Sequence, residues 1–355
     1  MAPAVANQLE TFAAGTETAV DVAQIERQLQ QLWQLAADSA KDESNRHITR
    51  ACLFNLVAYC ETEDARDHAT VIISEVTSRH PCRAIVLLAE HDKPVDEIAA
   101  SITAHCHLAG GGGKQVCCEQ ISIHASGPSV TRIPGAVLPL LESDLPTVLW
   151  WHGNFLERVD LFRRLRGVSD RVLFDTSTWS LPVALAKLAG AFAPGFADLS
   201  WTRLAMWQQL VAEAFDEAHC AAALARLQRI EITHGNGPGA HLRAQLLAGW
   251  AAAQLGWNAS DVPSRIKLIS RQDTDATAVG LISITLTGGD ATVCVQKNHG
   301  EQTARVTVNV PEACGLPRKR ALWPVDDASL LCQELDQASA SVVYLRALSM
   351  AAAIS

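Results

Sequence analysis

The sequence predicts two domains: an α/β domain with a mostly parallel sheet and one antiparallel hairpin, followed by an α+β domain with an antiparallel sheet. The chain has 355 residues, more than one ordinary core contains, and 48% of them are hydrophobic against 19% charged. Its first half carries continuous apolar runs of strand length, whereas its last third carries runs that alternate. We expect a flexible N-terminus over residues 1–18, the α/β domain over 19–179 and the α+β domain over 180–355.

The first domain opens with an amphipathic helix and a βαβ unit. The stretch "DVAQIERQLQQLWQLAAD" places its apolar residues on one helical stripe. "ACLFNLVAYC" (51–60) and "CRAIVLLAE" (82–90) are continuous apolar runs, and a helical pattern with Asp64 as its expected cap lies between them. Strands that are apolar on both faces are typical of a sheet covered by helices on both sides.

The rest of this domain mixes a hairpin with further parallel strands. Two alternating segments, 100–109 and 115–126, flank a run of glycines and predict an antiparallel pair. "PTVLWWHG" (146–153) and "RVLFDTSTW" (171–179) read as strands on either side of the helical pattern "FLERVDLFRRLR" (155–166).

A loose Ala/Pro/Gly stretch at 186–201 marks the expected domain boundary. Helical patterns follow at 202–227 and 240–255, and then four alternating strands are joined by "GGD" and "NHGE" turns that suit hairpins. A last helix is expected over 327–352. Helices segregated from an antiparallel sheet define an α+β domain.

The glycine run "HLAGGGGKQVCCEQISIH" (107–124) contains a Gly-Lys pair but does not match a phosphate-binding loop. Gln115 stands where such a loop needs Ser or Thr, and Leu108 stands where its first glycine belongs. The residues that follow alternate like a strand, so no helix N-terminus would face an anion. A hairpin turn is the plainest interpretation.

The cysteines beside this turn leave two alternatives open. Pairing across the turn would place Cys106 opposite Cys118, within reach of a disulfide, and His107 near Cys117. His105, His107 and Cys117 could instead supply three zinc ligands, although the chain has no C-x-x-C spacing. The default for ten scattered cysteines without a secretory signal is reduced thiols. We therefore predict no metal and no cofactor, with Cys106 and Cys118 as a redox pair to be tested.

Polar residues follow three predicted strands, at the edge of the sheet where open α/β folds bind ligands. Each of them also has a local interpretation as a helix cap or turn residue. The group comprises Glu61, Glu63, Asp64, His152, Asn154, Asp175 and Thr176. Trp150 and Trp151 lie close by, and an arginine-rich helix follows. Aromatic residues beside arginines are typical of protein–protein contacts.

Charge and hydropathy exclude some classes of function. The net charge of −9 and pI near 5.7 argue against a nucleic-acid-binding protein. No run reaches the length of a membrane span, and the first residues lack the basic start of a secretory signal, so we expect no membrane partner and a cytoplasmic protein. A G-x-S-x-G nucleophile motif is absent from the sequence as well.

Three segments carry a resemblance to a known family. "SRHPCRAIVLL" (78–88), "DLPTVLWWHG" (144–153) and "RVLFDTSTW" (171–179) closely resemble the OpcA family, in the same order, and the likeness extends over essentially the whole chain. The resemblance implies a noncatalytic assembly factor and allosteric effector that binds glucose-6-phosphate dehydrogenase. Such a protein would promote the active oligomer of that enzyme and so support NADPH production in the oxidative pentose phosphate pathway.

For the partner contact we expect the N-terminal strand ends and the arginine helix. The expected residues are His80, Arg83, Trp150, Trp151, His152, Arg163 and Arg164. An alternative is an enzyme or sensor that binds a sugar phosphate at the same strand ends, with Arg83 and His152 on the phosphate. A third is a thiol switch in which Cys106 and Cys118 control partner binding.

Overall fold

The chain folds into two compact units in the computed structural model. The structure describes residues 9–19, 22–42, 47–108, 114–179, 185–271, 280–311, 313–314, 316–337 and 342–354. Unit 1 contains residues 1–174 and 327–337, and unit 2 contains residues 175–326 and 338–355. The chain therefore returns to unit 1 for one short segment near its end.

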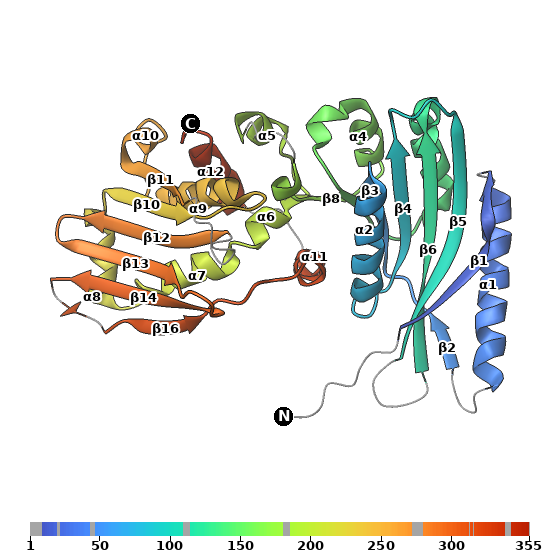
Figure 1. The fold of residues 1–355 in the computed structure, drawn as a ribbon, viewed down its shortest axis with the longest axis horizontal. Coiled ribbons are helices and arrows are strands. Elements are labelled where there is room, and N and C mark those ends of the chain that lie inside the picture. The colour runs from blue at the N-terminus through green and yellow to red at the C-terminus, as the bar shows by residue number, and fades with distance from the viewer. Residues whose placement is uncertain are drawn as a thin grey trace. The chain divides into compact units, whose positions relative to one another are not determined.

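Unit 1 is built on a mostly parallel sheet with the order β1-β5-β6-β4-β3-β7-β8 (Figure 1). Strands β6, β4, β3, β7 and β8 run parallel, β5 pairs antiparallel with β1 and β6, and the short β2 lies beside β6. This confirms the α/β class and the antiparallel hairpin. The strands are β1 (Leu9–Ala19), β2 (His47–Arg50), β3 (Phe54–Cys60), β4 (Cys82–Glu90), β5 (Glu97–Leu108), β6 (Lys114–Ser126), β7 (Thr147–Trp151) and β8 (Arg171–Phe174).

The described start of the chain differs from the expected flexible segment over 1–18. Residues Leu9–Ala19 form β1, which pairs with β5 from Leu9 opposite His107 to Ala19 opposite Ala99. A run of small and threonine residues gives little periodic signal, and only the exposed edge of β5 supplies its partner. Residues 1–8 lie outside the described part of the chain.

Helices cover both faces of this sheet. The Trp33 indole on α1 donates to Glu119 Oε2 over 3.2 Å, and the Gln120 amide contacts Thr70 Oγ1 on α2 over 3.3 Å. Because neighbouring residues of β6 point to opposite faces, α1 and α2 lie on opposite sides of the sheet. The helices of unit 1 are α1 (Val22–Asp42), α2 (Glu63–Val76), α3 (Ile133–Val137), α4 (Val159–Arg166) and α11 (Asp327–Asp336).

The cap of α2 is one of the local predictions that the structure corrects. Thr62 is the N-cap, and its hydroxyl accepts a hydrogen bond from the Ala65 amide over 3.2 Å. Asp64 lies inside the first turn with Glu63, where a carboxylate is favoured by the helix dipole. Threonine and aspartate are both good caps, so the pattern alone did not separate them.

The strand order defines a switch point between β3 and β7. From β3 the chain moves outward through β4 to β6, and it then returns to the other side of β3 to add β7 and β8. In open α/β sheets the crevice outside the carboxyl ends of two such strands is the usual place for a ligand. Here those ends are Cys60 and Trp151.

Unit 2 contains a mixed sheet of order β11-β10-β12-β13-β14-β15, with β16 also paired to β14. Among its described strands, only β10 and β11 pair in parallel. The predicted sheet is therefore confirmed, as a mostly antiparallel one. The strand β10 was missed because its six residues follow a long helical pattern. The strands are β9 (Phe196–Asp198, outside this order), β10 (Arg229–His234), β11 (Ile266–Ser270), β12 (Leu281–Gly288), β13 (Ala291–Lys297), β14 (Thr303–Val310), β15 (Ala313–Cys314) and β16 (Arg318–Ala321).

The helix α9 covers β10, β11 and β12, and α12 packs against α9. A Cβ at Gly249 of α9 would lie 2.3 Å from the Ala347 carbonyl oxygen, so the missing side chain permits this close approach. The single helix expected over 327–352 is wrong: its halves are α11 and α12, which pack on α2 and α9 in different units. The helices of unit 2 are α5 (Leu185–Ala191), α6 (Leu199–Thr202), α7 (Ala205–Glu213), α8 (Ala218–Ala221), α9 (Ala240–Gln254), α10 (Val262–Arg265) and α12 (Val342–Ala351).

Candidate functional site

The hairpin cysteines pair differently from the prediction. Cys106 lies opposite Cys117 and is disulfide-bonded to it, whereas Cys118 lies opposite His105. The predicted register, with Cys106 opposite Cys118, is wrong by one residue, and such a slip moves every side chain to the other face. The tip of the turn (109–113) lies outside the described residues. A redox role for this hairpin stays a prediction.

The other face of this hairpin holds an unreactive thiol and a bonded histidine. Burial raises the pKa of Cys118 to about 12, so it stays protonated at neutral pH. The buried His105 ring contacts the Gln120 side chain, Nε2 to Oε1, over 3.1 Å. Among the described residues, no three His, Cys, Asp or Glu side chains gather in an arrangement that could hold a metal ion.

A cluster of charged residues occupies the switch point at the end of β3. The Tyr59 hydroxyl donates to Glu61 Oε1 over 2.9 Å and lies 2.8 Å from His91 Nε2. Arg158 holds the same carboxylate through Nε and a terminal nitrogen, at 2.9 and 3.2 Å. Burial, followed by the positive charge of Arg158, lowers the pKa of His91. Because Glu61 and Arg158 are paired, their charges neutralise each other.

A second charged group lies at the end of β4, where Glu90 lies 2.6 Å from His124 Nε2 and 2.8 Å from Lys93 Nζ. Of the polar residues expected to converge at these strand ends, Glu61 contributes to the switch-point cluster. Asn154 instead accepts from the Leu156 amide and caps a short 3-10 turn. Asp175 and Thr176 belong to unit 2, so the predicted convergence is only partly correct.

Three of the seven residues expected at a partner contact, Trp150, Trp151 and Arg83, are buried. Trp150 and Trp151 are 3% and 1% exposed, like the rest of β7, in which every residue is buried. Trp151 stacks on Tyr59 with ring centroids 3.7 Å apart. The two tryptophans cannot act as surface anchors in this structure, which corrects that prediction. His152 is half-buried, its ring centroid 4.2 Å from that of Trp150.

Arg83 is also buried, at 4% exposure, and is held by carboxylates. Its Nε donates to Glu119 Oε1, one terminal nitrogen lies 2.9 Å from Glu142 Oε1, and the other donates to the Leu140 carbonyl over 2.9 Å. These contacts tie β4, β6 and the segment after α3 together. Arg83 is therefore a structural residue, and the expected contact with a partner or a phosphate does not fit its position.

Of the remaining predicted residues, His80 lies against α11, with Nε2 3.5 Å from Asp336 Oδ1, and its side chain is 17% exposed. Arg163 and Arg164 are exposed on α4. Arg163 makes a surface ion pair with Asp160 at 3.3 Å, and Arg164 donates to the Thr131 carbonyl over 2.8 Å. Of the predicted contact residues, those of the arginine helix keep the accessibility that a partner contact requires.

Unit 2 contains a buried network around two aspartates. Asp175 accepts from the hydroxyls of Ser177 and Ser200 at 2.6 and 2.7 Å and pairs with Arg203. Asp198 accepts from the hydroxyls of Thr176 and Tyr344 at 2.7 and 2.9 Å.

The two aspartates titrate differently. Although burial opposes it, the Arg203 charge, helped by the Ser177 and Ser200 hydroxyls, holds the pKa of Asp175 below its usual value. Complete burial and the neighbouring Asp175 raise the pKa of Asp198 to about 7. Near neutral pH this network therefore carries less negative charge than two carboxylates would supply.

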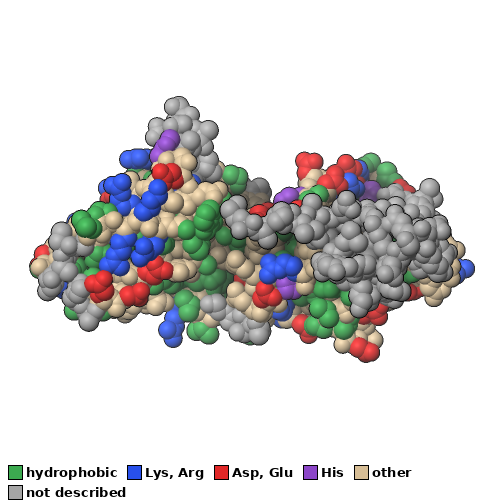
Figure 2. All heavy atoms as spheres, turned by 90° about the horizontal axis from the view of Figure 1, so that it is seen from below, with side chains coloured by type: hydrophobic (Ala, Val, Ile, Leu, Met, Phe, Trp, Pro, Cys, Tyr) green, Lys and Arg blue, Asp and Glu red, His purple; other side chains and the backbone are tan. Residues whose placement is uncertain are grey.

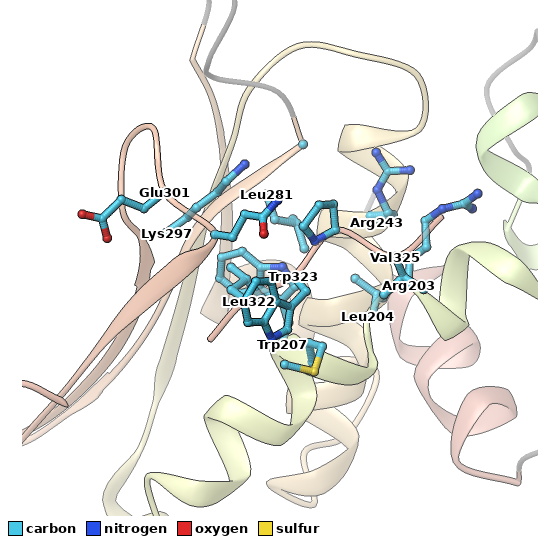
Figure 3. A pocket seen from close by; sticks show the side chains of 14 residues that line it. Arg203, Leu204, Trp207, Arg243, Leu281, Lys297, Glu301, Leu322, Trp323 and Val325 are labelled. Carbon is cyan, nitrogen blue, oxygen red and sulfur yellow. The ribbon is translucent and has the colours of Figure 1, made fainter. Parts of the chain in front are cut away.

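A cavity of about 400 Å³ opens beside this network (Figure 3). Arg203, at the end of α6, and Arg243, on α9, contribute to it, and Lys297 contributes from the end of β13. The indoles of Trp207 and Trp323 supply its apolar wall. The remaining lining residues are Leu204, Met206, Gly280, Leu281, Glu301, Gln302, Leu322, Pro324 and Val325. This site was not predicted from the sequence; Arg243 is the one Lys or Arg of α9, beside the polar residues His241, Gln245 and Gln254.

The basic segment "PRKR" (317–320) contributes its three cations to the edge strand β16. Figure 2 shows Lys and Arg side chains over unit 2 beside acidic ones. Lys319 lies 2.7 Å from Glu301, and Arg318 lies 2.9 Å from Glu217. These charges are matched on the surface. Among the described helices, none combines the length and apolar character needed to cross a membrane.

Comparison with known proteins identifies the class of protein. Residues 73–190 match the family described as the N-terminal domain of a glucose-6-phosphate dehydrogenase subunit. Residues 194–348 match the family described as the C-terminal domain of such a subunit. Together these matches span well over half of the chain. The protein belongs to the OpcA family, which confirms the resemblance seen in the sequence.

Relatives in cyanobacteria carry the provisional name OxPP cycle protein OpcA. The chain is 34% identical to one from Nostoc punctiforme over 191 residues, which is 52% of this chain and 40% of the relative. It is 32% identical to one from Synechocystis over 193 residues, 52% of this chain and 39% of the relative. The matched region thus spans about two fifths of the length of these relatives.

Among solved structures, an aldose-aldose oxidoreductase from Caulobacter crescentus aligns over 81% of this chain and 88% of its own, with 11% identity and a TM-score of 0.39. This similarity is too low to say anything about activity.

Proposed function

We propose that the protein binds glucose-6-phosphate dehydrogenase and acts as a noncatalytic assembly factor that promotes its active oligomer. The observation that carries the proposal is that two family models named for a subunit of that enzyme match consecutive parts of the chain. The names of the relatives place them in the OxPP cycle, which agrees with a role in the oxidative pentose phosphate pathway. The protein would act in the cytoplasm, where that pathway supplies NADPH.

The physical mechanism is a shift of population. A companion that binds the assembled enzyme better than the free protomers displaces the equilibrium toward assembly. A tenfold shift needs about 1.4 kcal/mol of differential binding. A few exposed side chains at an interface are sufficient for that.

On unit 1 the arginine helix α4 is the surface we propose for the contact. Arg163 is 73% exposed at its side chain, and Val159 and Val168 leave 46% and 36% of their surface exposed. Arginines beside exposed apolar residues suit a patch that meets a partner. The strand-end alternative receives less support, because Arg158 is already paired with Glu61 and Arg83 is buried.

The test combines activity with size. Purified chain is added to the glucose-6-phosphate dehydrogenase of the same organism, and the reaction rate and the elution volume of the mixture are recorded. Co-elution with a raised turnover or a lowered Michaelis constant is the expected result. No co-elution and unchanged kinetics, in both reducing and oxidising buffer, would overturn the proposal.

A charge reversal tests the surface separately. The double variant Arg163→Glu/Arg164→Glu is expected to weaken co-elution at least tenfold, since two cations become anions at the contact. Arg79→Glu is the matched control, because Arg79 is also an exposed arginine of unit 1, 64% exposed at its side chain. Equal binding by the double variant and the control would remove α4 from the interface while leaving the assembly role in place.

A further inference from the structure

Among the described residues, more positive than negative side chains line the cavity of unit 2. Arg203, Arg243 and Lys297 all line it, and Glu301 is the only carboxylate among the lining residues that the structure describes. Glu301 pairs with Lys319 at 2.7 Å, and Arg203 pairs with Asp175. Within the described part of the chain, no ion pair joins Arg243 or Lys297 to a carboxylate.

The position of Arg243 makes this charge costly. One of its terminal nitrogens donates a hydrogen bond to the Pro238 carbonyl over 3.0 Å. Burial and the neighbouring Arg203 lower the pKa of Arg243, and the charges of Asp175 and Asp198 only partly oppose this. A half-buried guanidinium beside a second cation gains stability when an anion reaches it, because the anion supplies both charge and hydrogen-bond acceptors.

The walls add a second element of recognition. Trp207 is 7% exposed, whereas Trp323 leaves 59% of its surface in solvent. Figure 3 shows both indoles among the lining side chains, with Lys297 on one side of the view and the two arginines on the other. An aromatic wall beside cations suits a ring that carries an anionic group. The volume of about 400 Å³ is in the range of small-molecule sites.

We propose that this cavity binds a small phosphorylated metabolite. Its phosphate lies against Arg243 and Lys297, and its ring lies against Trp323 and Trp207. A phosphate ester carries close to two negative charges at neutral pH, which matches the two cations without carboxylate partners. This site lies in unit 2 and is separate from the strand ends of unit 1. It does not rest on the proposed assembly role.

The test is calorimetric titration of the full chain without any enzyme present. The probes are inorganic phosphate, glucose 6-phosphate, AMP and uncharged glucose. One-to-one binding of at least one phosphate ester, more tightly than inorganic phosphate and with no heat from glucose, is the expected result. Absence of binding by all three phosphate compounds at about 10 millimolar, on the order of the weakest metabolite affinities, would overturn the proposal.

Two variants locate the site. Arg243→Gln and Lys297→Gln should each raise the Kd for the bound ester by about tenfold, the effect of losing one charge-assisted contact. Arg346→Gln and Lys267→Gln are matched controls on exposed positions of the same unit, and both should bind like the unchanged protein. Equal losses in variants and controls would show a general charge effect and refute the site.

A spectroscopic readout covers the case in which Arg243→Gln does not fold. In a proton–nitrogen spectrum of the indole groups, Trp323→Phe identifies the Trp323 signal by its disappearance. That signal should move on addition of the ester in the unchanged protein. If it stays in place while the calorimeter records binding, the ligand lies elsewhere and the proposed site is wrong.

Discussion

Unit 1 and unit 2 each contain an arginine that is withdrawn from solvent, and the two arginines differ in their charged neighbours. In unit 1, Arg83 is 4% exposed and contacts the carboxylates of Glu119 and Glu142 together with a backbone carbonyl. In unit 2, Arg243 is half-buried at a cavity, where it donates to a backbone carbonyl and forms no ion pair with a described carboxylate. The charge of Arg203 acts on it more strongly than the charges of Asp175 and Asp198.

We interpret the difference between Arg83 and Arg243 as one of role: Arg83 stabilises the fold, and Arg243 is available to a ligand. A guanidinium that is matched on all sides holds strands together, and removing it leaves an uncompensated anion inside the protein. A guanidinium that lines a cavity without a matching carboxylate contributes little to folding and can bind an external anion. The predictions below test that distinction, beginning with the largest effect.

Arg83→Met should lower the free energy of unfolding by about 3–5 kcal/mol, because Glu119 remains buried without its cation. Urea unfolding followed by circular dichroism measures the loss. Arg79→Met serves as the control, since its 3.9 Å contact with Asp336 is on the surface. A loss in Arg83→Met below about 1 kcal/mol would contradict a structural role for Arg83.

Asp198→Asn should change how stability depends on pH. The pKa of Asp198 rises on folding from its ordinary value of 3.8 to about 7, so the folded state binds its proton more tightly than the unfolded state does. The stability from this group is present below pH 4 and is lost as the pH rises toward 7. Asparagine can replace Asp198 here. Oδ1 of Asp198 accepts from two backbone amides, whereas Oδ2 contacts hydroxyls, which can accept from an amide nitrogen in its place.

Relative to the unchanged protein, Asp198→Asn should therefore gain stability between pH 4 and pH 7 and show a constant difference above that range. Unfolding curves at several pH values across this range measure the trend. Asp290→Asn, at a carboxylate 60% exposed, should show no such trend. A flat difference for Asp198→Asn would mean that Asp198 is ionised throughout.

Arg203→Gln and Arg243→Gln compare a paired and an unpaired cation within unit 2. Loss of Arg203 leaves Asp175 without its charged partner and should cost about 1–3 kcal/mol. Loss of Arg243 should change the free energy of unfolding by less than about 0.5 kcal/mol, since relief of the repulsion from Arg203 offsets the lost attraction to Asp175 and Asp198. Equal losses of unfolding free energy in chemical denaturation would show that Arg203 and Arg243 do not differ in their contribution to folding.

The smallest effect is expected at the surface of α4. Arg163→Gln breaks an ion pair whose partners are 73% and 95% exposed, so unfolding should shift by no more than about 0.5 kcal/mol. Thermal denaturation at low and high salt provides the comparison. A larger loss that salt removes would place Arg163 in a charge network that holds unit 1 together.

The sequence by itself determined the elements whose pattern is local. The strands β3, β4 and β7 were predicted from continuous apolar residues. Such runs occur because both faces of these strands are buried. The hairpin of β5 and β6 and the antiparallel strands of unit 2 followed from alternation and turn residues. The OpcA family followed from three short segments of this same α/β core.

Only the tertiary structure decided what depends on distant partners. It placed Cys106 opposite Cys117, because register is set by the whole ladder and one residue of slip reverses the faces. It buried Arg83 and Trp151, whose sequence neighbours suit a surface equally well. It also brought Arg203, Arg243 and Lys297 to one cavity from three separate elements. Charge compensation is a property of side chains close in space, and a local pattern contains no information about those distances.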